Sequence, residues 1–136
     1  MREIKFRGFN RKNNEWIYGF YLQNRGAHFV CPDEFADGKS WDDYEIDPDT
    51  LGQFTGLQDK NGKNIFERDI VEVISLRYGY KDFMEKMLCE IVYDNDLCCF
   101  DFFAFDRQRC MCTTILDAEI KVIGNIFDNK NLLKHG

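Results

Sequence analysis

Apolar and polar residues alternate from the start of the chain, with the period of two that is typical of half-buried β-strands. One face of the first predicted strand carries Ile4, Phe6 and Gly8, and the other carries Lys5 and Arg7. After the polar stretch 11–14 the same period returns, at Trp16, Tyr18, Phe20 and Leu22. This pattern predicts a β-hairpin within residues 3–22.

Short strands also dominate the second half of the chain. Residues 51–55 are followed by a tight turn over 56–63, where the pair Asn61-Gly62 tolerates positive φ. Five further strands are predicted by alternation, at 70–74, 87–93, 100–105, 111–116 and 119–127. Short strands joined by tight turns favour a small closed or half-closed barrel, because closure removes exposed edges. The predicted fold class is mostly β with little helix.

A boundary is predicted in the middle of the chain. A third extended stretch, 28–31, ends at Pro32, and the acidic segment that follows has room for one helical turn within 33–41. The sequence Asp47-Pro48-Asp49 then interrupts the chain. We therefore expect an N-terminal β-hairpin unit with an acidic loop at residues 1–48 and a barrel unit at residues 49–136.

Composition indicates a folded chain. The 136 residues are 44% hydrophobic and include 13 Phe, 6 Tyr and 2 Trp, so large rings must be buried against something. No run approaches the roughly 18 apolar residues that span a bilayer, and the charged N-terminus lacks the apolar core of a secretion signal. These features predict a cytoplasmic protein with no membrane partner.

The net charge of −6 is concentrated in one segment. Residues 33–49 hold eight carboxylates and a single base, Lys39, whereas the first twelve residues carry five bases and one acid. Two alternatives follow: the basic arm and the acidic segment attract each other, or they face different partners. A solvated acidic loop beside a basic edge strand is the simpler interpretation.

The cysteine pattern predicts neither disulfides nor a metal site. A reducing cytosol keeps thiols free, and no C-x-x-C motif occurs among Cys31, Cys89, Cys98, Cys99, Cys110 and Cys112. A zinc set of Cys89, Cys99, Cys110 and Cys112 would need three strands to converge. Buried thiols in strands are the simpler interpretation, so we expect no metal and no cofactor.

Three stretches of the chain form a recognisable pattern. They are Arg2-Glu3-Ile4-Lys5-Phe6-Arg7-Gly8-Phe9-Asn10, the central Gln53-Phe54-Thr55-Gly56-Leu57-Gln58-Asp59-Lys60-Asn61-Gly62-Lys63-Asn64-Ile65-Phe66-Glu67, and the C-terminal Ile123-Gly124-Asn125-Ile126-Phe127. In order and spacing they resemble the YopX family of phage and prophage proteins. The resemblance implies an origin in a phage or a bacterial prophage and a mostly β fold with an SH3-like barrel. It implies no established biochemical activity.

Two positions depart from the family pattern. Arg68 stands where the family usually has Gly, so a turn that requires positive φ there would be strained by about 1 kcal/mol. Lys130 stands where the family often has Pro before the paired leucines Leu132 and Leu133. The turn residues that the family motif supplies here are Gly56, Asp59, Asn61, Gly62, Glu67 and Asp69.

No catalytic site is predicted, and we expect that the chain is not an enzyme. The only histidines are His28 and the terminal His135, and His28 with Cys31 would point to opposite faces of a strand. The carboxylates Glu67 and Asp69 share a strand face and could form an acid/base pair. However, carboxylates beside tight turns commonly accept backbone N–H bonds that hold the turn.

A protein-interaction module is the function that the sequence favours. The aromatic content of 15% exceeds what a small core readily hides, and the candidate binding residues are Trp16, Trp41, Tyr44, Tyr78 and Tyr80. Host or phage proteins are possible partners, and a homo-oligomer is expected, with contacts through 33–49 and 77–86. The alternative is a single-strand nucleic-acid-binding accessory protein, which a sequence pI of about 4.9 disfavours.

Overall fold

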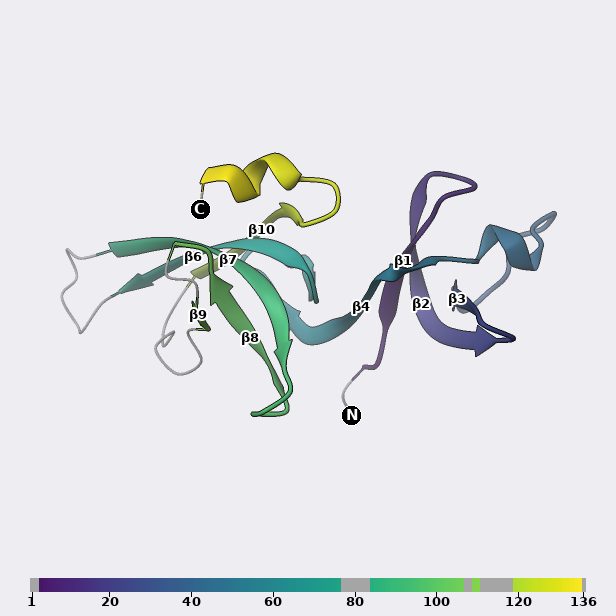
Figure 1. Ribbon diagram of the computed structural model, residues 1–136, viewed down its shortest axis with the longest axis horizontal. Helices are drawn as coiled ribbons and strands as arrows, with labels where there is room; N and C mark the ends of the chain where they lie inside the picture. The colour runs from purple at the N-terminus through teal and green to yellow at the C-terminus, as the bar shows by residue number, and fades with distance from the viewer. Residues whose placement is uncertain (1–2, 77–83, 107–108, 111–118, 136) are drawn as a thin grey trace. The chain divides into compact units, whose positions relative to one another are not determined.

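The structure is a computed structural model that describes residues 3–76, 84–106, 109–110 and 119–135 (Figure 1). Within these ranges the regular structure consists of strands and two short 3₁₀ helices, which confirms the mostly β prediction. The elements are β1 (Phe6–Asn10), β2 (Glu15–Asn24), β3 (Ala27–Cys31), η1 (Trp41–Asp43), β4 (Asp47–Gln58), β5 (Asn64–Phe66), β6 (Asp69–Leu76), β7 (Met84–Asp94), β8 (Cys99–Ala104), β9 (Arg109–Cys110), β10 (Glu119–Asn125) and η2 (Lys130–His135). Neither described helix is long enough to cross a membrane. Tyr78, Tyr80 and the strand predicted at 111–116 lie outside the described residues.

Contacts divide the chain into two compact units, Met1–Gly56 and Leu57–Gly136. The boundary predicted between residues 48 and 49 falls inside β4, which runs continuously from Asp47 to Gln58. Pro48 is therefore a strand residue, although it has no N–H to donate. The assignment of two separate domains stays a prediction, and each unit is described by itself below.

Unit 1 is built on the predicted hairpin, which the structure confirms. β1 and β2 pair antiparallel from Phe6↔Gly19 to Asn10↔Glu15, and β3 adds to the other side of β2. β4 pairs with β1 with a shift of register between Arg7 and Phe9, so the strands of this unit are ordered β3-β2-β1-β4; β5, which follows β4 in the strand order of that sheet, belongs to unit 2. The buried cluster of this unit consists of Ile17, Val30, Cys31, Tyr44 and Ile46.

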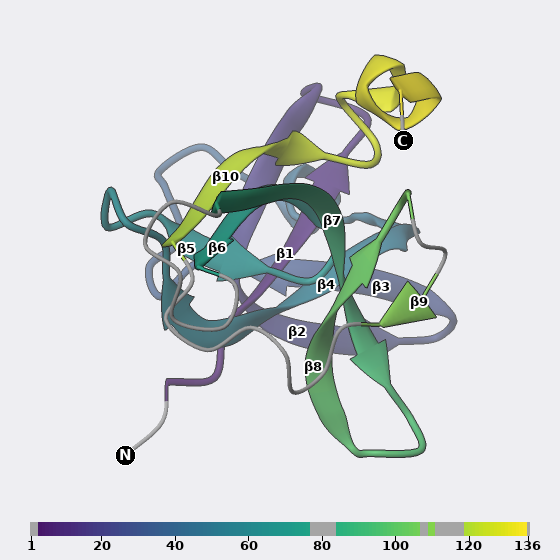
Figure 2. The same ribbon diagram turned by 90° about the vertical axis from the view of Figure 1, so that its left-hand side faces the viewer.

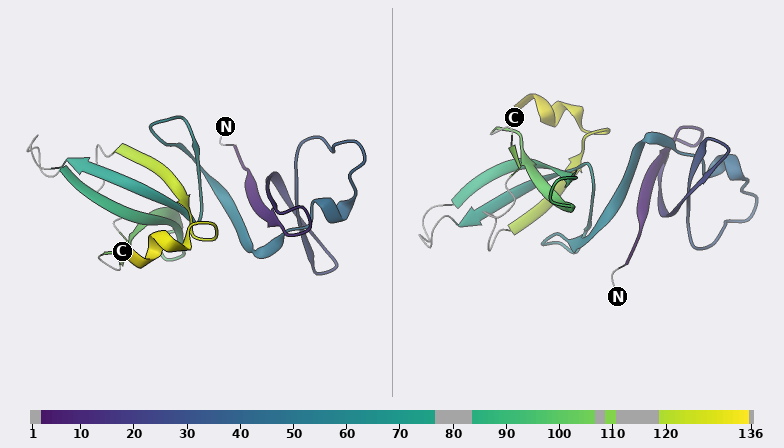
Figure 3. Two further views of the ribbon diagram at one scale, coloured as in Figure 1. Left: turned by 90° about the horizontal axis from the view of Figure 1, so that it is seen from above. Right: turned by 60° about the horizontal axis from the view of Figure 1, so that its bottom comes forward.

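Unit 2 contains an antiparallel sheet in the order β10-β6-β7-β8-β9. β7 curves along its length, and β10 runs beside β6 (Figures 2 and 3). Its buried cluster consists of Ile65, Val71, Val73, Met87, Cys89, Ile91, Ala104 and Val122. In the part of the chain that the structure describes, neither sheet closes on itself, so the SH3-like barrel predicted for residues 49–136 is not confirmed.

The cysteines whose side chains are described differ sharply in exposure. Cys31 and Cys89 are fully buried, whereas Cys98 and Cys99 are exposed beside the β7–β8 turn. Burial, aided by the negative charges of Asp106 and Asp101, raises the pKa of Cys89 to about 12, and burial raises the pKa of Cys31. Because the thiolate is the reactive form, the buried thiols should be inert.

We expect brief treatment with iodoacetamide at about pH 8 to alkylate Cys98 and Cys99 and to leave Cys31 and Cys89 unmodified. Peptide mass spectrometry of the digested protein measures the modification of each site. Labelling in denaturant provides the control, because all four thiols then become accessible. Rapid modification of Cys89 in the native protein would contradict this packing.

Candidate functional site

The central family motif forms a turn that is held by one carboxylate. Asp59 is buried, and its Oδ1 accepts the backbone N–H groups of Asn61 and Lys63, each at 2.9 Å. Its Oδ2 accepts the N–H of Val122 in β10, also at 2.9 Å, so the turn is tied to a strand 63 residues away. Gly62 supplies the positive φ of 81° that the turn requires.

Electrostatics explain why a carboxylate occupies position 59. Burial by itself would raise the pKa of Asp59, but the N–H groups of Val122, Lys63 and Asn61 together outweigh it and hold the pKa below its ordinary value. The ionised form is therefore the form that the fold stabilises. Gly56, which precedes the turn, also has a positive φ, of 89°.

The second motif turn, between β5 and β6, is braced by Asp69. Its buried Oδ2 accepts the N–H of Phe66 at 2.8 Å, as expected for a carboxylate that holds a turn. Glu67 lies in the turn itself, half-buried, and lines an open hollow of about 330 Å³ with Arg68, Tyr93 and neighbouring residues. Asp69 is sequestered at 2% exposure, which leaves it poorly placed to share proton transfer with Glu67.

Arg68 adopts the conformation that the family's glycine would favour. Its φ is 71°, in the left-handed region where a side chain is strained. Two backbone hydrogen bonds nevertheless fix this residue. The N–H of Arg68 donates to the carbonyl oxygen of Ile91, and the carbonyl oxygen of Arg68 accepts the N–H of Ile126. The guanidinium also pairs with Glu90 at 3.0 Å. These contacts show how the turn keeps its shape without glycine.

The C-terminal motif caps β10. The Oδ1 of Asn125 accepts the N–H groups of Phe127 and Asp128, each at 2.9 Å. The backbone N–H of Asn125 donates to Oδ1 of Asn129 at 3.1 Å. A Cβ at Gly124 would lie 2.3 Å from Oδ1 of Asn129, so a larger residue there would have to displace the Asn129 side chain. Each of the three motif turns is therefore held by a side chain that accepts backbone N–H groups.

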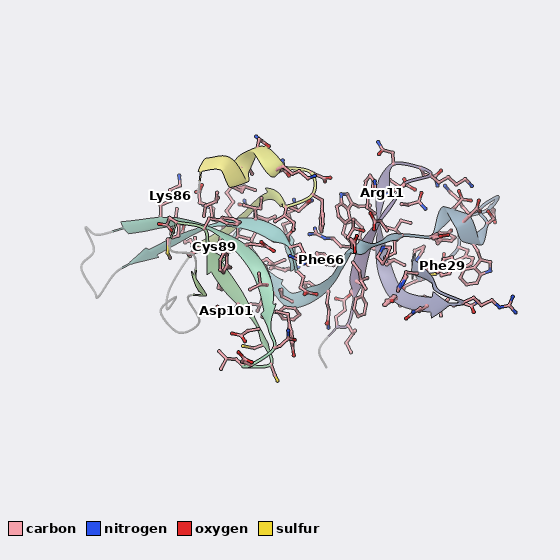
Figure 4. The ribbon with its side chains drawn as sticks, viewed as in Figure 1. Arg11, Phe29, Phe66, Lys86, Cys89 and Asp101 are labelled. Atoms are coloured by element: carbon pink, nitrogen blue, oxygen red, sulfur yellow. The ribbon has the colours of Figure 1, made fainter. Side chains whose placement is uncertain are left out.

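Two bases at the end of the basic arm, Arg11 and Lys12, bind the acidic segment, so the first of the two sequence alternatives holds for them. Arg11, labelled in Figure 4, pairs with Asp47, and Lys12 lies 3.0 Å from both Asp42 and Asp43. Arg11, Lys12, Asp42 and Asp47 border a hollow of about 420 Å³, and both of its cations are already paired with carboxylates. Asn10, almost fully buried beneath them, donates to the carbonyl oxygens of residues 42 and 45 at 3.2 and 2.7 Å.

The acidic segment also covers the outer edge of β3. The N–H of Val30 donates to the carbonyl of Tyr44 at 3.1 Å, and the N–H of Ile46 donates to the carbonyl of His28 at 2.9 Å. Phe29 and Glu45 form an isolated antiparallel bridge between these contacts, so their side chains lie on the same face.

A row of aromatic rings runs from β3 across the acidic segment. Phe29, labelled in Figure 4, meets Trp41 at a centroid distance of 5.5 Å, and Trp41 meets Phe35 at 5.2 Å. Phe35 stacks on Tyr44 at 4.6 Å. Trp41 and Phe35 are 52% and 48% exposed, whereas Tyr44 is 5% exposed and its hydroxyl accepts the N–H of Ala36. The buried tyrosine thus anchors two exposed rings.

Carboxylates lie close to this row in the sequence. None of the ion pairs of the described residues involves Asp33, Glu34, Asp37 or Glu45, and all four residues are exposed. We call these acids, the two exposed rings and the half-buried Phe29 the acidic aromatic surface, which consists of Phe29, Phe35, Trp41, Asp33, Glu34, Asp37 and Glu45.

The sequence-predicted binding residues separate into different places. Trp41 and Tyr44 both contact the ring of Phe35. Because Tyr44 is buried, it supports the exposed rings and does not itself offer a contact surface. Trp16 lies elsewhere on β2, where its ring meets Phe9 at 5.3 Å and the guanidinium carbon of Arg7 lies 4.9 Å from its centroid. Phe35 was missed, although a large apolar residue between the acids at 33–34 and 37 was a signal for it.

Metal-binding and nucleophilic arrangements are not assembled in the described residues. No group of three His, Cys, Asp or Glu side chains there is placed to hold a metal. His28 stacks on Tyr21 and shares a hydrogen bond with its hydroxyl, while Cys31 is buried. Cys112 lies outside the described residues, so the absence of a zinc site stays a prediction.

The ion pairs predict a response of the acidic segment to acid. The hydrogen bond from Arg11 is the largest cause that lowers the pKa of Asp47, and the N–H of Asp49 is the next. The pKa of Asp42 is lowered most by the hydrogen bond from Ser40 and next by that from Lys12. A carboxyl with a lowered folded pKa contributes stability above its unfolded pKa of about 3.9 and loses it as the pH falls through the folded value. We expect Trp41 emission, measured in a Trp16→Phe background, to change only below about pH 4.

An Arg11→Met variant tests the cause of this transition. Without the guanidinium, the pKa of Asp47 should return toward its ordinary value, so the change in Trp41 emission should begin at higher pH. Identical transitions in the two proteins would contradict the role of this ion pair.

Comparisons with known proteins agree with the motifs. The family model described as YopX protein matches residues 5–134. The crystal structure of protein EF1440 from Enterococcus faecalis is similar at 25% sequence identity with a TM-score of 0.55, over 98% of this chain and 99% of that one. Among curated proteins, no sequence matches this chain. Because the family match extends over nearly the whole length, through each of the turns described above, the chain belongs to the YopX family.

Proposed function

We propose that this protein is a protein-interaction module and that its contact region is the acidic aromatic surface. The observation that carries the proposal is the pair of exposed rings, Phe35 and Trp41, which is held in place by the buried Tyr44. Exposed aromatic residues on a fixed support are typical of protein interfaces, because they give large contact area with little loss of conformational entropy. The family resemblance supports a phage or prophage product that acts in the cytoplasm of a bacterial host.

Internal pairing of the basic residues favours protein over nucleic acid as the partner. Arg7 is 5% exposed over the Trp16 ring, and Arg11 and Lys12 pair with carboxylates. With Lys5, these are the bases of unit 1 from which a single-strand groove would have been built. Phosphate groups would also meet the uncompensated carboxylates of the acidic segment.

Photo-crosslinking tests the proposal. A benzoylphenylalanine placed at Asp37 should capture proteins from infected host cells, and a Phe35→Ser/Trp41→Ser double variant should abolish those captures. The matched control is Leu57→Ser, since Leu57 is a 60% exposed apolar residue remote in sequence from the surface. An unchanged capture profile in the double variant would overturn the proposal.

Homo-oligomerisation remains a prediction. Tyr18 and Phe20, which are 44% and 50% exposed on β2, give a second apolar area that another copy could cover. The β3 edge is less available for strand pairing, because the acidic segment already bonds to it. We expect light scattering to show a mass above that of the monomer that falls on dilution and in a Tyr18→Ser/Phe20→Ser variant. A monomer mass at all concentrations would exclude this association.

A further inference from the structure

We propose that the acidic aromatic surface takes a cationic, arginine-rich peptide segment of a partner protein. This inference rests on the proposed function and adds the chemistry of the partner. It follows from the charges left over after internal pairing and from the character of the exposed rings.

The acidic segment keeps a negative charge after its own ion pairs are formed. Of the eight carboxylates in residues 33–49, the basic turn binds three, at Asp42, Asp43 and Asp47. Five remain, at Asp33, Glu34, Asp37, Glu45 and Asp49. The eight negative charges of the segment stand against three positive ones, from Lys39, Arg11 and Lys12, so the balance is −5. Such a field attracts a cationic ligand and repels an acidic one.

The exposed rings favour a guanidinium among cations. Trp41 is the best of the aromatic side chains for cation–π contact, and Phe35 meets it nearly at right angles, with an interplanar angle of 86°. The chain already uses this chemistry internally, where Arg7 lies over the Trp16 ring. A guanidinium that stacks on Trp41 can also donate planar hydrogen bonds to nearby carboxylates, which an ammonium does less well.

Other occupants fit the surface poorly. A neutral apolar peptide would desolvate carboxylates without pairing them, which costs free energy. The basic residues of the β1–β2 turn do not supply the cation from within the chain, because they are already paired with Asp42, Asp43 and Asp47. The complementary ligand is therefore a basic segment from another protein.

Fluorescence anisotropy with a labelled Arg-Gly repeat peptide tests the inference on the full chain. We expect saturable binding that weakens as salt rises, about tenfold weaker binding in an Asp33→Asn/Glu34→Gln/Asp37→Asn variant, and a Lys-Gly peptide that binds less tightly. A Glu15→Gln/Asp96→Asn/Asp106→Asn variant has the same change in net charge at exposed sites elsewhere and should bind normally. Equal weakening in both triple variants would mean attraction to net charge alone and would overturn the inference.

Substitutions of Trp41 test the contribution of the ring. Trp41→Leu keeps an apolar side chain but removes the π face, so it should weaken binding about three- to fivefold, whereas Trp41→Phe should lose less. Circular dichroism of each variant checks that the sheet is intact. Binding unaffected by Trp41→Leu would overturn the inference.

The two proposals fail in distinguishable ways. If the Arg-Gly peptide does not bind but the captures that depend on Phe35 and Trp41 persist, the partner chemistry is wrong and the interaction function stands. If those captures are also absent, both proposals fail.

Discussion

Asp59→Ala is expected to lower the free energy of unfolding of residues 57–136 by about 4 kcal/mol. Three backbone N–H groups lose a charged acceptor, and that of Val122 is buried where water cannot replace it. Hydrogen bonds to charged groups contribute about 1.5–3 kcal/mol each, less than additively when they share one carboxylate. Urea denaturation followed by hydrogen exchange of β6 and β10 peptides measures the loss.

Asp94→Ala is the matched control for this prediction. The Oδ1 of Asp94 also accepts two N–H groups of its own turn, from Asp96 and Leu97, but these bonds are exposed and local. We expect a loss of about 1 kcal/mol there. Equal losses in the two variants would show that the bond from Asp59 to β10 contributes nothing beyond the turn.

Asp59 also predicts a pH dependence. Since its folded pKa lies below the ordinary value, its contribution is complete above about pH 4 and is lost as the pH falls through the folded pKa. Asp59→Asn keeps one carbonyl acceptor but cannot titrate, so the stability of unit 2 should decline less steeply in acid. A decline as steep as in the wild-type protein would assign it to other carboxylates.

Gly19→Ala is expected to destabilise residues 1–56 by about 3 kcal/mol or more. A Cβ at position 19 would lie 1.9 Å from the carbonyl oxygen of Cys31 and 3.0 Å from Cα of Pro32. Both are backbone atoms, so relief requires β2 and the end of β3 to separate. The midpoint of urea denaturation, read from the emission of Trp16 and Trp41, reports the change.

Gly38→Ala separates this steric effect from the general cost of replacing glycine. Gly38 has a φ of 78°, and a Cβ added there would meet no other atom within 4 Å, so alanine should cost about 1 kcal/mol through backbone strain alone. If Gly19→Ala costs no more than Gly38→Ala, the close approach of β2 to Cys31 is not rigid.

The sequence predicted the features that depend on local chemistry. The period of two located the β1–β2 hairpin, and the Asn-Gly pair located the tight turn. The carboxylate of Asp69 was interpreted as holding its turn, and it does. Each of these depends on residues close together in the chain.

Features that depend on distant contacts could not be predicted. Residues of both faces of β2 are apolar, so alternation did not show that Ile17 and Gly19 face inward while Tyr18 and Phe20 are exposed. Pro48 suggested that the chain is interrupted there, but β4 runs from Asp47 through Pro48 to Gln58. The irregularity is instead a shift of register in the pairing of β4 with β1. Phe35 joined the aromatic row only through its contacts with η1 and Tyr44.

The bond between Asp59 and Val122 has a consequence for the order of folding during synthesis. Unit 1 has all its sequence once residue 56 has left the ribosome, and β1 can pair with β4 at once. Unit 2 must wait, because β10, its last strand, both pairs with β6 and donates to Asp59 across 63 residues. Until β10 has been synthesised, one edge of β6 is unpaired. A nascent β protein is most prone to wrong strand pairing while such an edge is open. The nascent chain therefore carries a completed first unit while the second still needs protection.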